Sequence, residues 1–132
     1  MFLSINDVMN WLLPISLGLL LGYYIATRKK TDPDSIIIMN PEEFRNNMRK
    51  GQLFDIRKEE EFKKSKINGS RNFPKRSLLA SLYKIRKDQA VFLYSDTDKG
   101  VVKKVANKLS KKGYNPIYIL KGGFNEWPFS KK

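Results

Sequence analysis

The sequence predicts an α/β domain with a parallel β-sheet, preceded by one transmembrane helix. Two observations predict this architecture: residues 8–27 carry no charge, and short apolar runs alternate with helix-like segments along the rest of the chain. Strands that alternate with helices imply right-handed crossovers and therefore a parallel sheet. The length of 132 residues and the apolar content of 41% suit one compact domain rather than a disordered polyelectrolyte.

The first predicted element is a transmembrane helix over residues 8–27. A helix of this length rises about 30 Å, the thickness of the hydrocarbon core of a bilayer. The basic residues Arg28–Lys30 follow the apolar segment, whereas a cleavable signal peptide carries its positive charge before it. The positive-inside rule then places residues 1–7 outside the cell membrane and the folded domain in the cytoplasm. The alternative is a buried helix of a soluble domain.

Small residues recur along one face of this helix. Gly18, Gly22 and Ala26 lie four residues apart, a spacing that lets two transmembrane helices approach closely. A homodimer formed through this face is therefore one expectation for the chain.

The folded domain is expected over residues 36–132, after a basic juxtamembrane linker over residues 28–35. Its strands are predicted at short apolar runs: Ile36–Met39, Leu53–Ile56, Ala90–Tyr94 and Ile117–Leu120. Its helices are predicted between these runs: one capped by Asn40 and ending at Gly51, Glu59–Lys64 with Phe62 buried, one that begins at Ser77, and one with the apolar stripe Val101, Val102, Val105, Ala106 and Leu109.

The domain is strongly basic. Residues 28–132 hold all 26 Lys and Arg residues and 12 of the 13 acidic residues. An anchored domain of this charge is attracted to the anionic lipid of the adjacent leaflet. Nucleic acid is a less favoured partner, because the lysines are dispersed and the aromatic residues lie at apolar positions. We therefore expect the membrane, its anionic surface and an unidentified protein as partners.

The composition excludes several classes of chemistry, because the chain contains no cysteine and no histidine. Without a thiol there is no disulfide, no thiolate metal site and no cysteine nucleophile. Without an imidazole, the side chain whose ordinary pKa lies nearest neutrality is missing. A serine hydrolase would need that histidine.

Polar residues follow two of the predicted strands and mark the candidate site. Ligands of a parallel sheet bind at the carboxyl ends of its strands, where Asp55 lies and where the next loop begins. A strand, a loop and a helix N-terminus form an anion cradle there. The loop consists of Ser95, Asp96, Thr97, Asp98, Lys99 and Gly100.

Three segments of the chain resemble the signatures of rhodanese-like domains, in the order and spacing of that family. They are the Asp-x-Arg and Glu-Phe pattern in Leu53–Phe62, the Asn-x-Pro ending of Ile67–Pro74, and the Gly-Gly and Trp pattern in Tyr118–Trp127. The resemblance covers residues 36–129 and implies a five-stranded parallel sheet with helices on both faces. It also implies that Arg57 pairs with nearby acids, Asp55 and Glu61, to brace the loop.

The chain departs from active members of that family at the decisive position. These members carry a persulfide on a cysteine immediately after the strand that corresponds to Val91–Tyr94. The match to that strand places Ser95 at this position, whereas a gapless count back from Gly113 places Asp96 there. Neither a hydroxyl nor a carboxylate can hold the transferred sulfur. We therefore expect a catalytically inactive sulfurtransferase homologue that acts as a binding or adaptor module.

Two other functions stay open at this point. The chain could be a sulfurtransferase component whose thiol comes from a partner, or a basic binder of membrane surfaces or nucleic acid. Asp96 and Asp98 are expected to place two carboxylates at the rim of the loop and to repel anions. A metal site would need further ligands at fixed positions, and Gly100 occupies one of them. No metal and no cofactor is expected.

Overall fold

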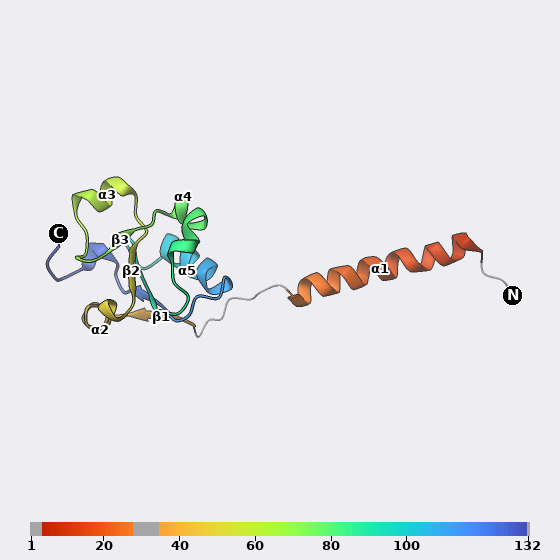
Figure 1. Cartoon of the computed structure of the whole chain (residues 1–132), viewed down its shortest axis with the longest axis horizontal. Helices are drawn as coiled ribbons and strands as arrows, with labels where there is room; N and C mark the ends of the chain where they lie inside the picture. Colours follow the sequence, from red (N-terminus) through yellow and green to blue (C-terminus); the bar gives the residue numbers. More distant parts are fainter. Residues whose placement is uncertain (1–3, 28–34, 132) are drawn as a thin grey trace. The chain divides into compact units, whose positions relative to one another are not determined.

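The computed structural model describes residues 4–27 and 35–131 (Figure 1). It divides the chain into two compact units, Met1–Lys30 and Thr31–Lys132. Residues 28–34 of the predicted linker and residues 1–3 of the predicted N-terminal segment lie outside the described residues.

Helix α1 (Ile5–Thr27) begins three residues before the predicted span. The Ser4 hydroxyl donates to Asp7 Oδ2 at 2.7 Å, so a residue expected to precede the helix belongs to its first turn. A carboxylate in the first turn favours such an early start. The segment Ile5–Ala26 is long and apolar enough to cross a membrane, and none of it is buried within the chain. An added Cβ at Gly18 or Gly22 would meet nothing within 4 Å.

The second unit contains the predicted five-stranded parallel sheet. Its strands are β1 (Ile36–Met39), β2 (Gln52–Asp55), β3 (Arg71–Asn72), β4 (Val91–Tyr94) and β5 (Ile117–Leu120). They are arranged in the order β1-β5-β4-β2-β3, and every neighbouring pair is parallel. All four residues of the central strand β4 are buried, as an apolar run covered on both faces requires.

Helices cover both faces of this sheet (Figure 1). They are α2 (Pro41–Asn47), which continues as a 3₁₀ turn over Met48–Lys50, α3 (Glu59–Lys64), α4 (Lys75–Leu78), which continues as a 3₁₀ helix over Leu79–Lys84, α5 (Val101–Lys111) and a 3₁₀ turn over Phe124–Glu126. The Asn40 side chain accepts from the Glu43 amide at 2.9 Å, which confirms the predicted helix cap.

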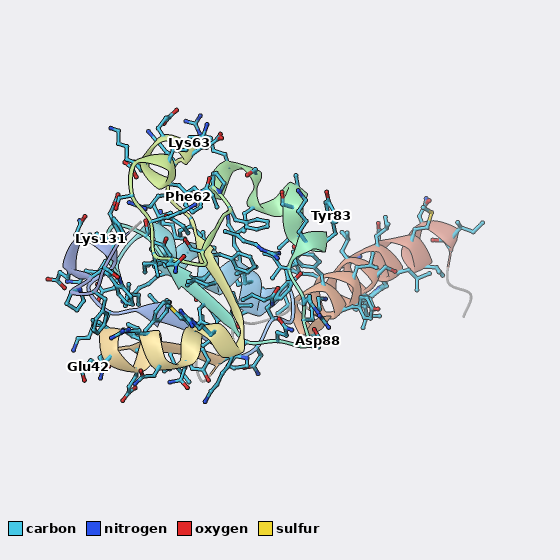
Figure 2. All side chains as sticks on the ribbon, turned by 60° about the vertical axis from the view of Figure 1, so that its left-hand side comes forward. Glu42, Phe62, Lys63, Tyr83, Asp88 and Lys131 are labelled. Carbon is cyan, nitrogen blue, oxygen red and sulfur yellow. The ribbon has the colours of Figure 1, made fainter. Side chains whose placement is uncertain are left out.

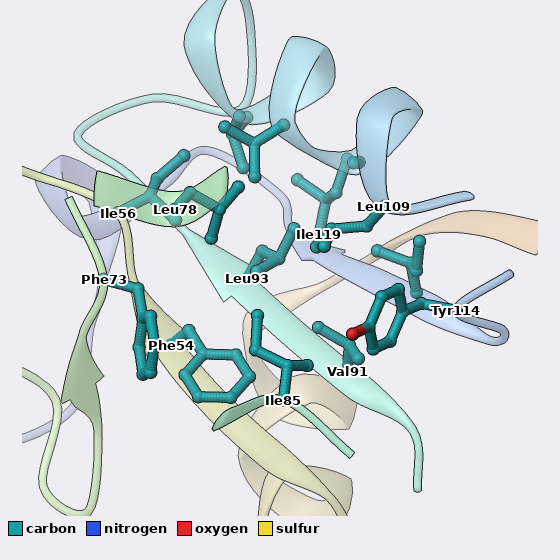
Figure 3. Packing of buried hydrophobic residues seen from close by; sticks show 14 residues of the cluster. Phe54, Ile56, Phe73, Leu78, Ile85, Val91, Leu93, Leu109, Tyr114 and Ile119 are labelled. Carbon is teal, nitrogen blue, oxygen red and sulfur yellow. The ribbon is translucent and has the colours of Figure 1, made fainter. Parts of the chain in front are cut away.

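The alternation of side chains along β4 divides the core into two clusters. Val91 and Leu93 pack against α4 and α5 (Figure 3), while Phe92 and Tyr94 face α2 and the C-terminal segment. Trp127 belongs to the second cluster and is 5% exposed. Both clusters are apolar, as a sheet buried on two faces demands.

Three local expectations were wrong. Phe62 is only half-buried, like the rest of α3, which has no buried residue. The Lys66 ammonium lies over the Phe62 ring, 4.5 Å from its centre. Val101 is 40% exposed, since it starts α5 beside an open cavity. The helix expected to begin at Ser77 begins at Lys75 instead.

Candidate functional site

A cavity of about 540 Å³ opens at the carboxyl edge of the sheet. The segments that follow β2 and β4, the start of α4 and the start of α5 form its walls. The lining residues are Ile56, Arg57, Lys58, Glu59, Glu60, Glu61, Pro74, Lys75, Arg76, Ser95, Asp96 and Val101. The position agrees with the expectation that ligands of a parallel sheet meet the carboxyl ends of its strands.

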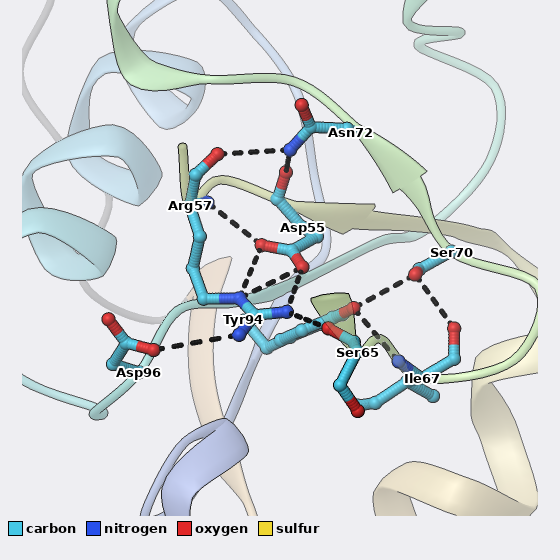
Figure 4. Close-up of polar contacts among 8 residues, drawn as sticks. All are labelled: Asp55, Arg57, Ser65, Ile67, Ser70, Asn72, Tyr94 and Asp96. Atoms are coloured by element: carbon cyan, nitrogen blue, oxygen red, sulfur yellow. Dashed lines mark hydrogen bonds and ion pairs between the residues drawn. The ribbon is translucent and has the colours of Figure 1, made fainter. Parts of the chain in front are cut away.

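One wall of the cavity is built on a buried ion pair between Asp55 and Arg57 (Figure 4). Arg57 Nη2 donates to Asp55 Oδ2 at 2.7 Å, and Nε donates to both carboxylate oxygens at 3.0 and 3.1 Å. The backbone amide of Arg57 donates to Asp55 Oδ1 at 2.8 Å. The Asp55 side chain is fully buried and that of Arg57 is 5% exposed, so the geometry of this pair is tightly constrained.

The guanidinium of Arg57 joins this wall to the rest of the site. Its Nη2 donates to the Ser65 carbonyl at 2.6 Å, and its Cζ atom lies over the Phe124 ring, 4.0 Å from the ring centre. Burial alone would lower the pKa of Arg57, but the hydrogen bonds and the charge of Asp55 outweigh burial and raise that pKa. Arg57 is therefore a permanent cation in the wall.

A second layer of hydrogen bonds supports the pair. The Asn72 side-chain amide donates to the carbonyls of Asp55 and Arg57 at 3.1 and 3.0 Å. The Tyr94 hydroxyl accepts from the Ile67 amide at 3.1 Å and lies 2.8 Å from the Ser70 hydroxyl. Burial, together with the nearby charge of Asp55, raises the pKa of Tyr94. Tyr94 therefore stays a neutral phenol that connects β4 to the chain before β3.

The loop that follows β4 forms a second wall and docks on the segment after β5. The Ser95 and Asp96 carbonyls accept from the Phe124 and Asn125 amides at 2.8 and 3.1 Å. Gly123 has φ +67°, and a Cβ there would lie 2.5 Å from the Asp96 carbonyl oxygen. Glycine is therefore required at position 123 for the two segments to approach this closely.

The two loop carboxylates play different roles. Asp98 Oδ2 accepts from the Gly122 amide at 2.9 Å, and Asp98 does not line the cavity among the described residues. Asp96 does line it, with Oδ1 3.7 Å from Arg57 Nη1 and its side chain 46% exposed. The expectation of two carboxylates at the rim is therefore corrected to one, because Asp98 is occupied by a backbone donor.

The structure also places the remaining predicted site residues. Ser95 lines the cavity, while Thr97, Lys99 and Gly100 lie outside the lining. The Thr97 hydroxyl instead donates to the Lys99 carbonyl at 3.3 Å. Glu61 lines the cavity, but within the part of the chain that is described the ion pairs of Arg57 are with Asp55 and Asp96. The acid beside Arg57 is therefore Asp96 rather than the expected Glu61, and its contact with Arg57 is long and half-exposed.

Sequence reasoning missed several contributors to the site. Lys75 and Arg76 bring positive charge to the cavity from the start of α4, and Asn72 and Ser65 hold the Asp55–Arg57 pair. Asn72 belongs to the Asn-x-Pro pattern, so a signal for it was present. In residues 4–27 and 35–131, no group of three acidic side chains could hold a metal ion.

Comparison with known proteins agrees with this geometry. The family model described as Rhodanese-like domain matches residues 40–128. Uncharacterized protein YqhL of Bacillus subtilis is 40% identical over 89 residues, which cover 67% of this chain and 70% of YqhL.

Solved structures show the same fold. A rhodanese-related protein of Thermoplasma volcanium has a TM-score of 0.67 at 19% identity, with 73% of this chain and 97% of that chain covered. A rhodanese-like domain protein of Staphylococcus aureus has a TM-score of 0.62 at 20% identity, with 69% and 90% covered. The family model, the sheet order and the cavity lead to one conclusion: this chain belongs to the rhodanese-like domain family.

Proposed function

We propose that this chain is a non-catalytic rhodanese-like module that α1 anchors in the cell membrane, with the cavity binding a protein partner on the cytoplasmic side. The observation that carries the proposal is the absence of cysteine from all 132 residues in a domain that keeps the braced cavity wall. The Asp55–Arg57 pair and its hydrogen bonds hold the shape of the cavity without the thiol.

The groups at the cavity wall support a binding role over sulfur transfer. Sulfur transfer needs a thiolate that attacks the donor and carries the sulfur as a persulfide. The two residues that could correspond to the family cysteine are Ser95 and Asp96, and both line the cavity. A hydroxyl and a carboxylate form no persulfide, and the Asp96 carboxylate repels the anionic donors that a thiolate enzyme would accept.

The charges of the cavity suit a polar segment of a protein. Arg57, Lys58, Lys75 and Arg76 supply positive charge, and Asp96 and residues 59–61 supply negative charge around the same space. A partner segment that carries both positive and negative side chains would complement this lining. A small anion would instead be repelled by the Asp96 carboxylate. This mixture favours a protein partner.

The membrane part of the proposal rests on α1 and on the charges next to it. The helix is apolar, long enough to span and unburied within its own chain. Arg28–Lys30 follow it directly, and clustered basic residues mark the cytoplasmic end of a span.

The experiment is a thiosulfate:cyanide sulfurtransferase assay on the purified full chain in detergent, with three cysteine variants beside it. Wild type is expected to form no thiocyanate above the protein-free blank. Ser95→Cys and Asp96→Cys place a thiol in the cavity, while Thr97→Cys places one on the same loop outside the lining and serves as the matched control. Turnover by wild type would overturn the non-catalytic proposal.

A second measurement tests partner binding at the cavity. Proteins crosslinked to the wild-type chain in membranes are compared with those crosslinked to Asp96→Ala and to Lys103→Ala. Asp96 lines the cavity and Lys103 is an exposed residue outside it. Loss of one specific protein with Asp96→Ala alone is expected, and equal recovery with both variants would contradict binding at the cavity.

A further inference from the structure

The edge of the sheet opposite the cavity is where the tether to α1 enters the domain. All five strands are parallel, so their amino ends share one edge and their carboxyl ends share the other. The Ser35 hydroxyl, just before β1, lies 2.9 Å from the Ser110 hydroxyl in the last turn of α5. The chain therefore enters the domain beside the end of α5, on the side away from the cavity.

This amino-terminal edge carries a group of exposed lysines that we call the basic edge. Lys87 Nζ lies 5.5 Å from the centre of the Tyr114 ring, and Lys84 lines a second cavity with Gly51 and Gln52. Among residues 35–131, none of these lysines pairs with a carboxylate. The basic edge consists of Lys50, Lys84, Lys87, Lys108, Lys111 and Lys112.

Acidic residues are distributed in the opposite way. Within residues 35–131, Asp88 is the carboxylate of the amino-terminal edge, and Arg86 neutralises it through a 2.7 Å ion pair. Asp55 ends β2, Asp96 follows β4, and Glu42 lies in the first turn of α2 after β1, so all three lie at the carboxyl edge. Figure 2 shows Glu42 and Asp88 at opposite ends of the domain. Among residues 35–131, the six lysines of the basic edge therefore have no carboxylate partner, and they outnumber the two acidic residues, Asp32 and Asp34, that precede Ser35 in the sequence.

The sequence between α1 and the domain is short. Eight peptide steps separate Thr27 from Ser35, so the chain between them spans at most about 29 Å even when fully extended. Such a short connection holds the leaflet surface at high effective concentration next to the basic edge. A nucleic acid would have to be recruited from solution, so the lipid surface is the favoured occupant.

We propose that the basic edge docks on an anionic lipid leaflet and thereby turns the cavity toward the cytoplasm. The inference rests on the membrane anchor of the proposed function and adds the orientation of the domain to it. Lysines within a Debye length of an anionic surface are attracted to it, and salt screens that attraction. Docking by the amino-terminal edge leaves the opposite edge free for a partner.

The test uses the full chain reconstituted in nanodiscs that contain phosphatidylglycerol or only phosphatidylcholine. Because the chain has no cysteine, a single introduced thiol can be labelled with a fluorophore. Tyr83→Cys places the label beside the basic edge, where Tyr83 is 82% exposed, and Thr97→Cys places it on the cavity loop. Quenching by headgroup-spin-labelled lipid then reports which edge lies near the bilayer.

The expected result is strong quenching at position 83 in phosphatidylglycerol, weak quenching at position 97, and loss of the difference at high salt. The triple variant Lys108→Gln, Lys111→Gln and Lys112→Gln lowers the docked-to-undocked ratio about fivefold for each lysine, the ratio that corresponds to about 1 kcal/mol. The matched control Lys64→Gln, Lys121→Gln and Lys131→Gln removes the same charge from exposed positions away from the basic edge and leaves quenching at position 83 unchanged.

Equal quenching at both positions, or equal effects of both triple variants, would overturn the inference. It would also be overturned if lipid left position 83 unquenched while a labelled RNA bound the basic edge. Failure of the anchor is seen separately, because an unanchored chain leaves the nanodiscs at high salt. Catalysis is also separate, since thiocyanate formation by a docked chain would refute the proposed function alone.

Discussion

The two walls of the cavity differ in how they are held. The Asp55–Arg57 pair is buried and is held by its own hydrogen bonds. Asn72 and Tyr94 make further hydrogen bonds that support the chain around it. The loop wall exposes nearly half of the Asp96 side chain and depends on backbone contacts with the segment after β5. The comparison teaches that the scaffold of the cavity is separable from its chemistry, because the scaffold persists where no thiol is present.

The largest expected effect comes from breaking the buried pair. Arg57→Ala leaves the Asp55 carboxylate buried without its partner, which costs about 3–5 kcal/mol of unfolding free energy. Chemical denaturation of the full chain in detergent, followed by circular dichroism, measures this loss. Arg86→Ala is the control, since the Arg86–Asp88 pair has the same 2.7 Å distance but is exposed. Equal losses for both variants would contradict the special role of the buried wall.

The next effect concerns the contact that seats the loop. Gly123→Ala places a Cβ 2.5 Å from the Asp96 carbonyl oxygen, in addition to a positive φ that costs about 1–3 kcal/mol for a residue with a side chain. Gly69→Ala is matched to it, because Gly69 has φ +89° with open space around its Cβ position. We expect Gly123→Ala to lower the melting temperature more than Gly69→Ala does. A similar decrease for both variants would show that the loop moves to accommodate the added Cβ without cost.

Tyr94 supports the Asp55–Arg57 wall through its hydrogen bonds to Ile67 and Ser70, and its titration gives a pH signature. Tyr94→Phe leaves the buried Ile67 amide without its acceptor, at a cost of about 1–3 kcal/mol. Because burial raises the pKa of Tyr94, the unfolded chain loses this proton first, and the stability of wild type falls as pH rises above about 10. Tyr94→Phe is expected to fall less steeply over that range when unfolding is measured at several pH values. If stability falls with pH equally steeply in Tyr94→Phe and in wild type, Tyr94 is not the source of the pH dependence.

Much of the fold was predictable because its signals are local. The apolar runs of the strands and the cap at Asn40 depend on residues close in sequence. The role of Asp98 was not predictable, since its donor, the Gly122 amide, is brought near only by the pairing of β4 with β5. Phe62 likewise depends on how α3 packs, which periodicity in a six-residue helix does not report.

The smallest expected effect on stability concerns Asp96. Its pair with Arg57 is long and partly exposed, so Asp96→Asn should change the melting temperature little. The same variant removes a negative charge from the cavity and is expected to strengthen thiosulfate binding, measured by isothermal titration. Wild type is expected to bind neither thiosulfate nor phosphate at sub-millimolar affinity, and tight binding by wild type would contradict the electrostatic role of Asp96.

The central claim is that the cavity has kept its braced wall but carries no atom that can hold sulfur. Intact-mass spectrometry of the purified full chain after incubation with thiosulfate, before and after cyanide treatment, tests it most directly. The predicted result is an unchanged mass for wild type under both conditions. A one-sulfur increase that cyanide removes as thiocyanate would contradict the claim.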